Sequence, residues 1–547
     1  MSLESPIRGV QAPSTFEELP RAQVIATMAA LMLTLLLAAL DQMIVGTAMP
    51  RIIAELQGFE RYAWVATAYM VASTAVVPIV GKLSDLYGRR LFLIGGVLSF
   101  LVASVLCGAS ANMVQLILFR GFQGLGAGVM MAMTFTVVGD LFPPARRGRV
   151  QGLFGSVWGL ASVIGPPVGG LLTDRASWRW VFYVNVPLGL LALAALLFLF
   201  PKIVPALQRR QIDYLGAITL LCWVVPLLLA LSWGGVQYPW TSAPIVGLLI
   251  VTVLGLSAFV YAERRAAEPI LPPNLLKNRT VVVTLTMSAL MGVGMFSVIL
   301  FTPLWVQGVI GASATESGTV LLPMTIGIVV ANLLSGQIMS RTGRYKLLAL
   351  GGFVMIVAGA ALLTTMDALT SYSTVVMYMI VVGVGLGTEM PILAVVVQSS
   401  VPRTMLGVAS SSLQFFRSIG ATLGIAVLGS VLVGRFSALF LSTLPADLVA
   451  AISPGKLATL GNPQTLLNPE SGASLRDAVA QAGGNTGGAD VILGAIRQAL
   501  AVSLHDVYAA TAAVVLIGLL VTFFLPEIPL EQGSKAERPP DSTFEAA

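Results

Sequence analysis

Residues 81–90 read GKLSDLYGRR, and a degraded copy, GQIMSRTGRYK, occupies residues 336–346. Three positions of the first segment recur 255 residues later: Gly81, Gly88 and Arg89 as Gly336, Gly343 and Arg344. Two further glycines recur after 259 residues: Gly148 and Gly165 as Gly407 and Gly424. A series at nearly constant spacing predicts a duplicated bundle of six helices. Asp85 is replaced by Ser340 in the copy, so the two segments are not equivalent.

The composition indicates a polytopic membrane protein. The 547 residues are 56% hydrophobic and 10% charged, with a mean hydropathy of +0.89, whereas soluble proteins are about 25% charged. A membrane-spanning helix needs ~20 apolar residues. Fourteen stretches qualify: 23–48, 63–80, 91–109, 113–139, 150–172, 180–200, 214–233, 243–261, 280–308, 319–339, 346–365, 372–397, 405–434 and 505–525. The predicted fold is all-α, with two six-helix bundles and two inserted helices.

The distribution of Arg and Lys over the loops predicts the orientation. Loops on one side carry basic clusters within 82–90, 146–149, 202–210, 264–279 and 341–346, and also Arg403. The short loops on the other side carry only Arg51, Arg61, Arg175 and Arg179. Cytoplasmic loops are the basic ones. The protein is therefore expected in the cytoplasmic membrane, with both termini in the cytoplasm.

The spans divide the chain into five parts. These are a cytoplasmic tail (1–22), a first bundle (23–200), the two extra helices with their linkers (201–279), a second bundle (280–525) and a second cytoplasmic tail (526–547). The second bundle contains a long external loop, 435–504, rich in Gly, Pro, Asn and Ser. Loops of this length are usually functional or disordered, and disorder or a loose external cap is the preferred interpretation.

Asp41 interrupts the first span after eighteen uncharged residues, QVIATMAALMLTLLLAAL (23–40). A carboxylate at that depth costs ~2.5–3.5 kcal/mol on insertion scales and usually faces the interior of a bundle. At 1.5 Å per residue, Asp41 lies ~18 Å and Arg120 ~11 Å below the outer surface. The two can therefore share a layer. Asp41 is predicted to bind a proton, an ion or a cationic substrate; the alternative is that Arg120 merely neutralises it.

The second bundle offers a similar pair, Glu389 and Arg417. By the same arithmetic they lie ~15 Å and ~20 Å from the inner surface. A permanent pair would be a structural bridge, whereas an acid that is alternately paired and exposed can carry a proton. Both roles, and substrate binding by Glu389, remain open at this point.

Several classes of function are excluded or disfavoured. His505 is the only histidine, so no His-cluster metal site is expected, and no GxxxxGK[ST] phosphate-binding loop is present. The net charge of +6 comes from short loops rather than from a basic binding face, which argues against nucleic acid. An intramembrane enzyme would need a Ser, His or metal constellation that one histidine cannot supply. We therefore expect neither an enzyme nor a cofactor.

Five segments together resemble the major facilitator superfamily, specifically its fourteen-helix drug:proton antiporter family. GKLSDLYGRR resembles the signature loop between the second and third helices. RGFQGLGAG (120–128), GLASVIGPPVGG (159–170), LDQMIVGTAMP (40–50) and WRWVFYVNVPLG (178–189) resemble further motifs of that family. The resemblance covers residues 23–434 and the last helix. Glu389 departs from the commonest pattern, in which an apolar residue stands at that position.

The resemblance assigns roles to two groups of residues. A cytoplasmic gate is expected from Gly81, Asp85, Gly88, Arg89 and Asp140. Asp140 is placed to pair with Arg89, and Asp85 can face the helix N-terminus near Leu406–Gly407, where the dipole favours an anion. The alternative is a simple topology anchor. Gly165, Pro166 and Gly169 are identified as part of the antiporter helix, in which small residues permit close packing and proline permits a kink.

These features predict a proton-coupled antiporter that exports amphipathic, cationic organic compounds by alternating access. The expected partners are those compounds, protons and the lipid bilayer, with the chain acting as a monomer. The proton gradient replaces any cofactor. The main alternative is an exporter of a lipid or an endogenous metabolite on the same fold; an uptake symporter is a weaker one.

Overall fold

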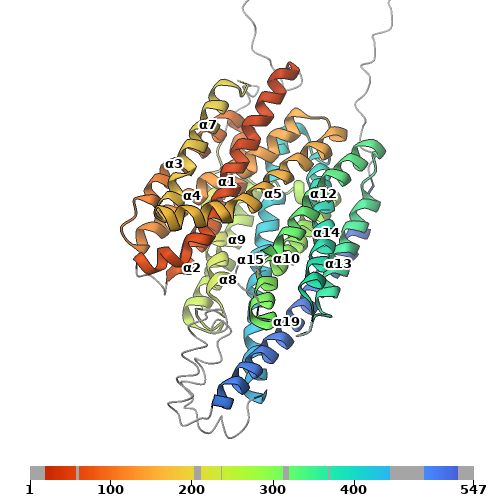
Figure 1. Ribbon diagram of the computed structural model, residues 1–547. Helices are drawn as coiled ribbons and strands as arrows, with labels where there is room; N and C mark the ends of the chain where they lie inside the picture. Colours follow the sequence, from red (N-terminus) through yellow and green to blue (C-terminus); the bar gives the residue numbers. More distant parts are fainter. Residues whose placement is uncertain are drawn as a thin grey trace, which may run out of the picture.

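The computed structural model describes residues 19–56, 61–201, 211–235, 237–311, 319–367, 370–443 and 486–527. Fourteen helices in these ranges are long and apolar enough to cross a membrane, which confirms the predicted number of spans (Figure 1). The predicted tails, 1–22 and 526–547, fall mostly outside the described residues, as does 444–485 of the predicted external loop.

The first bundle contains six spans, the last of which is broken. Its helices are α1 (Arg21–Leu56), α2 (Tyr62–Tyr87), α3 (Arg89–Gly108), α4 (Met113–Leu141), α5 (Pro144–Arg175), α6 (Trp180–Tyr183) and α7 (Asn185–Phe198). Pro187 has no N–H to donate to the carbonyl group of Tyr183, one turn earlier, which explains the break between α6 and α7. Asn185 thereby becomes the first residue of α7, inside the bundle.

The inserted pair and the second bundle follow. The inserted helices are α8 (Tyr214–Trp233) and α9 (Ala243–Arg265). The second bundle comprises α10 (Arg279–Trp305) with a π-helical turn at Val306–Ile310, α12 (Leu321–Thr342), α13 (Lys346–Leu363), α14 (Tyr372–Ser399), α15 (Leu406–Thr443) and α19 (Thr486–Phe523). Two helices extend into the segment predicted as an external loop, 435–504: α15 continues to Thr443, and α19 begins at Thr486.

The two bundles repeat the same helix pairings, as a duplication requires. In the first, α1 packs on α5, α2 on α4 and α3 on α4; in the second, α10 packs on α15, α12 on α14 and α13 on α14. The match extends to single glycines. A Cβ on Gly126 of α4 would lie 2.7 Å from the carbonyl oxygen of Gly96, and one on Gly385 of α14 would lie 2.8 Å from that of Gly352. Only glycine allows both approaches.

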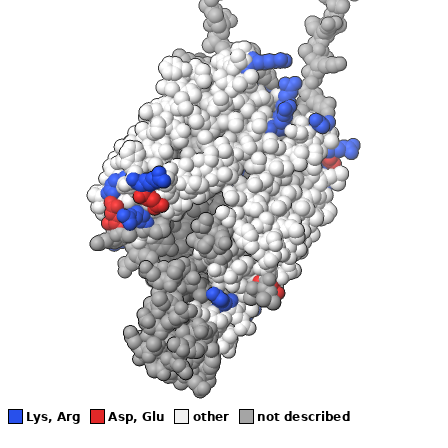
Figure 2. Space-filling model, in the orientation of Figure 1, with Lys and Arg blue, Asp and Glu red and all other residues white. Residues whose placement is uncertain are grey.

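The outer surface is that of a membrane protein. Large apolar side chains point outward from most helices, among them Leu91, Leu118, Phe198 and Leu254. Figure 2 shows that Lys, Arg, Asp and Glu gather toward the two ends of the visible face, with a band between them that is almost free of charge. An uncharged band between charged ends is what a helical bundle needs in order to lie across a bilayer. The chain is therefore a multi-pass membrane protein.

The molecule has two ends along the direction of its helices. The α2–α3 end carries the turn at Gly88, and the opposite, α1–α2 end is where α1 ends and α2 begins. Most close approaches between the six-helix bundles at described glycines lie in the half nearer the α2–α3 end, and the one at Gly159 lies at mid-length of α5. In the half nearer the α2–α3 end, α2 packs on α15 and the first half of α5 packs on α12. The bundles are thus joined at the α2–α3 end.

The inserted helix α8 and the turn that follows it touch both bundles. α8 packs on α2 and on α15, beside which it lies in Figure 1. At the α1–α2 end, the ring of Trp233 lies 4.6 Å from that of Trp64 in α2. In the turn after α8, Trp240 Nε1 donates to Ser430 Oγ of α15 at 2.8 Å. Gly235 adopts φ +76° in this turn, a conformation that residues with a side chain rarely adopt.

Candidate functional site

Asp41 lies at the centre of a buried polar cluster in the first bundle. Its side chain is fully buried and receives three hydrogen bonds from two other helices. Arg120 Nη1 donates to Oδ2 at 2.7 Å, while Gln123 Nε2 and Asn185 Nδ2 donate to Oδ1 at 2.9 Å and 2.7 Å. The predicted proximity of Asp41 and Arg120 is confirmed as an ion pair.

Further side chains hold Arg120 and Gln123 in place. Arg120 Nη1 also donates to Gln123 Oε1 at 2.6 Å, and the guanidinium lies 4.2 Å from the centre of the Tyr69 ring. Gln123 Nε2 donates to Ser104 Oγ of α3 at 2.8 Å. Five spans thus meet around one carboxylate. Gln123, Asn185 and Ser104 were not predicted as site residues, although Gln123 follows Arg120 by one helical turn.

The cluster can exist in two chemically distinct forms. While Asp41 is ionised, its charge is balanced by Arg120 and its oxygens are satisfied by three donors. If Asp41 takes up a proton, the negative charge that attracts Arg120 disappears, and the hydrogen bonds from the three donors become weaker. Removing one partner of a buried ion pair typically costs ~3–5 kcal/mol. Loss of the charge on either residue would therefore weaken the contacts between the helices that meet there.

The residues of the predicted gate come together at the α2–α3 end. Asp85 Oδ1 and Oδ2 accept the backbone N–H groups of Gly407 and Val408 at 3.0 Å each, at the N-terminus of α15. Arg89 forms ion pairs with Asp85 and with Asp140, the latter at 2.9 Å. The contacts predicted for Asp85 and Asp140 are both confirmed. One carboxylate of the first bundle thus caps a helix of the second.

Two glycines make that contact possible. Gly88 adopts φ +93° between α2 and α3, in the left-handed region that favours glycine. A Cβ on Gly81 would overlap the side chain of Ser411 and lie 2.8 Å from the carbonyl oxygen of Gly407. Gly81 therefore permits α2 to approach α15 closely enough for Asp85 to reach the helix N-terminus.

The predicted antiporter helix, α5, uses different glycines for different neighbours. Gly165 and Gly169 face Met43 and Thr47 of α1, so they pack within the first bundle. Pro166 points outward. Contacts with the second bundle come from earlier glycines on α5, whose Cβ atoms would collide with α12: Gly148, Gly152, Gly155 and Gly159. The surface between the bundles is thus built from the first half of α5 rather than from the motif around Pro166.

The predicted pair of Glu389 and Arg417 does not form. Glu389 is fully buried on α14, and its carboxylate lies against Gly352 of α13. Neither of its oxygens bonds another side chain. Arg417, on α15, bonds Gln414 on its own helix. The depth estimate carried no information on the direction in which each side chain leaves its helix.

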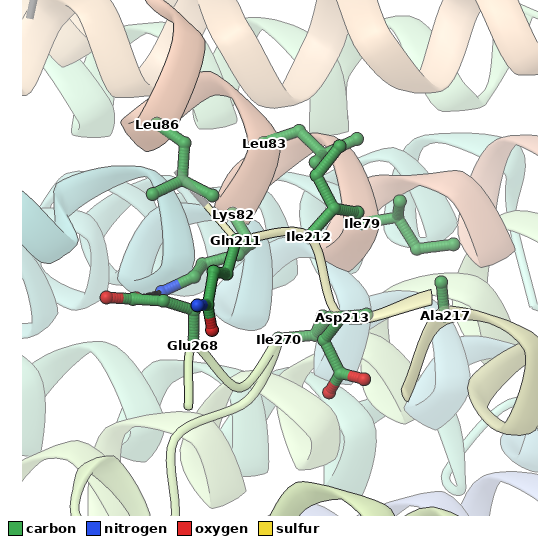
Figure 3. A pocket seen from close by; sticks show the side chains of 10 residues that line it. All are labelled: Ile79, Lys82, Leu83, Leu86, Gln211, Ile212, Asp213, Ala217, Glu268 and Ile270. Atoms are coloured by element: carbon green, nitrogen blue, oxygen red, sulfur yellow. Dashed lines mark hydrogen bonds and ion pairs between the residues drawn. The ribbon is translucent and has the colours of Figure 1, made fainter. Parts of the chain in front are cut away.

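A pocket lies beside the residues of the predicted gate. It is lined by residues from the end of α2, from the segment that starts α8 and from the linker after α9 (Figure 3). Lys82 Nζ forms an ion pair with Glu268 Oε2 at 2.6 Å across it. Lys82 follows Gly81, so the end of α2 contacts α15 on one side and the linker that leads into α10 on the other. Within the described ranges, no cluster of His, Cys, Asp and Glu could hold a metal ion.

Comparison of the sequence with known proteins identifies relatives over most of the chain. The model of the family described as Major Facilitator Superfamily matches residues 31–425. The multidrug transporter protein MdtP of Bacillus subtilis (strain 168) is 41% identical over 522 residues, which cover 93% of this chain and 94% of that protein. Multidrug resistance protein 3 of the same organism is 37% identical over 449 residues, covering 82% and 87%.

Solved structures with a similar fold lead to the same family. The human organic anion transporter MFSD10 aligns with a TM-score of 0.58 at 14% identity, covering 92% of this chain and all of that one. The proton:xylose symporter XylE aligns with a TM-score of 0.56 at 12% identity, covering 92% and 96%. At these identities the likeness concerns the fold alone. With the family match and the two multidrug relatives, it shows that the chain belongs to the Major Facilitator Superfamily, whose members are transporters rather than enzymes.

Proposed function

We propose that the protein is a proton-coupled antiporter that exports amphipathic, cationic organic compounds across the cytoplasmic membrane by alternating access. The observation that carries this proposal is the buried Asp41 cluster. Burying an ionisable group at that depth costs free energy, so such groups are usually paired or functional. Asp41 is paired with Arg120 here and, in the proposed cycle, alternates between that ion pair and a bound proton. The efflux role is supported by the named multidrug relatives. No cofactor is required, and the monomer contains the whole cluster.

In the proposed cycle the α2–α3 end faces the cytoplasm, as the loop charges predict. The bundles are joined at that end here, which corresponds to an outward-facing conformation. Proton uptake by Asp41 releases Arg120 and weakens the convergence of α1, α4 and α7. Opening toward the cytoplasm then requires Asp85 to leave the N-terminus of α15. A compound bound from the cytoplasm displaces the proton, and the gate closes again behind it.

The most detailed part of the proposal is the charge of the exported compound. A cation can pair with Asp41 in place of Arg120, which supports a cationic preference. Glu389 does not serve this role here, since it faces α13. Arg417 supports a second candidate, a compound with an acidic group, because this arginine pairs with no described carboxylate. Export of a lipid or an endogenous metabolite remains the alternative with a different biological role.

The experiment that tests the proposal is transport by the purified protein in liposomes with an imposed pH gradient. The panel contains cationic dyes, amphipathic anions and labelled lipids. Accumulation of dyes against their gradient, abolished by a protonophore, is the expected result. Movement of labelled lipid alone would establish the alternative, and accumulation of anions alone would assign the site to acidic compounds.

The pair of Lys82 and Glu268 is expected to influence the gate through the end of α2. Partly exposed ion pairs contribute ~0.2–1 kcal/mol, so Lys82→Glu should slow transport by about two- to fivefold. The double variant Lys82→Glu with Glu268→Lys restores an attractive pair and should recover the rate. Initial rates of pH-driven dye uptake measure the effect. Equal slowing in the single and double variants would show that the pair does not act on the gate.

A further inference from the structure

Glu389 is the buried ionisable group that the proposed cycle leaves unused. Its exposed fraction is 0%, and its carboxylate lies between α13 and α14, against the backbone at Gly352 and Phe353. A Cβ on Gly352 would overlap the carboxylate, so the glycine provides the space that the group occupies. The residue is ten positions before the end of α14, which places it ~15 Å from the α2–α3 end.

No counter-charge reaches this site within the described residues. Neither carboxylate oxygen bonds another side chain. The charged groups on the helices packed against α14 lie at helix ends, are exposed or bond elsewhere. Arg341, Lys346 and Arg279 lie at the ends of α12, α13 and α10, and four charged residues of α5 are exposed: Arg146, Arg149, Asp174 and Arg175. The remaining ones bond elsewhere: Arg417 to Gln414, Arg435 to Asp506, Arg147 to the carbonyl of Phe142, Arg120 to Asp41 and Asp140 to Arg89. An unpaired buried carboxylate is far more costly than a neutral carboxyl group.

The duplicated bundle shows that packing alone does not require an acid here. Residues 124–128, GLGAG, correspond to residues 383–387, GVGLG, at the 259-residue spacing of the repeat. Glu389 then corresponds to Met130, which is fully buried in the first bundle. The equivalent glycine on the neighbouring helix, Gly96, lies against Val129, the residue before Met130. Apolar side chains thus occupy this part of the first bundle, whereas a carboxyl group occupies the matching part of the second.

We propose that Glu389 is a second proton-binding site, separate from the Asp41 cluster, which holds its proton in the conformation seen here and releases it when α14 moves away from α13. This inference rests on the proposed antiport and adds to it a second proton per cycle. Direct contact with substrate is not part of this proposal, because Glu389 has no exposed surface here.

The local structure of α14 provides a route for that movement. Gly383 and Gly387 contact Met324 and Ile328 of α12, while Gly385 contacts α13. Pro391 follows Glu389 by two residues and lacks the N–H that would bond the carbonyl group of Gly387. Bending of a helix is least costly at such a position. A bend there would admit water to Glu389 from the nearer, α2–α3 end.

The first test records the proton itself, without any substrate. Infrared difference spectra of the purified protein, taken through a pH titration, contain the carbonyl stretching band of protonated carboxyl groups. We expect a band that is absent in Glu389→Gln and in Glu389→Met, the latter matching the residue of the first bundle. Glu55→Gln is the control and should retain the band, because the hydrogen bond from Arg179 keeps the pKa of that exposed carboxyl below its usual range. Identical spectra for the wild type and both Glu389 variants would overturn the proposal.

The second test counts protons. The substrate gradient that balances a given pH gradient in liposomes gives the number of protons exchanged per substrate. Both Glu389 variants should still transport, with the ratio reduced by one proton. An unchanged ratio would overturn the coupling role even if the band is lost. The spectra need no transport, so loss of the band in both variants supports the proton site at Glu389 independently of the proposed antiport. If transport by the wild type does not respond to the pH gradient, the proposed function is contradicted instead.

Discussion

Asp41→Asn is expected to reduce pH-gradient-driven transport to the level of liposomes without protein. The amide keeps the shape of the side chain but cannot take up a proton. It also leaves Arg120 buried without its counter-charge, and breaking a buried ion pair in this way costs ~3–5 kcal/mol. Transport and the melting temperature must therefore be measured together, because an unfolded variant would give the same loss of transport.

The double variant Asp41→Asn with Arg120→Gln separates the two effects. It removes both charges, so most of the lost stability should return, since replacing a whole buried pair is often nearly neutral. Proton-driven transport should stay absent, because no group in the cluster titrates. If the double variant regains pH-driven transport, the cluster is a structural bridge and Asp41 does not couple the proton.

Asp85→Asn is expected to weaken closure of the α2–α3 end. Asp85 presents one oxygen to each of two backbone N–H groups at the start of α15. An asparagine presents a donor to one of them and loses its charge toward Arg89. Hydrogen bonds to charged groups contribute ~1.5–3 kcal/mol. The balance between closed and open conformations should therefore shift by roughly ten- to a hundredfold, with slower turnover and little change in substrate affinity.

A cysteine at Met339 reports that shift. Met339 is fully buried and lies against Gly148, between the two bundles. The variant Met339→Cys is made in a background with Cys222→Ser, which removes the exposed one of the two cysteines. Labelling of Met339→Cys by a water-soluble maleimide should accelerate when Asp85→Asn is added. Asp174→Asn makes the same chemical change at an exposed position near the α1–α2 end and should leave labelling unchanged. A loss of affinity with normal labelling and turnover would show that Asp85 is not part of a gate.

The number of spans could be predicted because lipid requires long apolar helices. The duplication could be predicted because a repeated fold preserves the glycines at close helix contacts. α15 and α19 extend past the predicted spans. Each has 38 residues, more than the ~20 that a bilayer requires, so a rule based on span length gave no reason to extend them.

The candidate sites show what residue depth can and cannot predict. Depth brought Asp41 and Arg120 into one layer, and the pair exists because both side chains also point toward the bundle interior. Depth also brought Glu389 and Arg417 together, yet each helical residue turns by about 100° relative to the last. Their side chains therefore leave different faces of α14 and α15. Gln123 and Asn185 are uncharged and gave no signal of burial, so only the packed structure reveals them.

Proton movement driven by substrate is the most direct measure of coupling at Asp41. Liposomes that contain the purified protein and a pH-sensitive dye are prepared without any pH gradient, and a transported compound is then added outside. Antiport at Asp41 predicts that protons leave the lumen as the compound enters, and that the double variant of Asp41 and Arg120 shows no proton flux. Uptake of the compound by the wild type with no opposing proton movement would contradict the account.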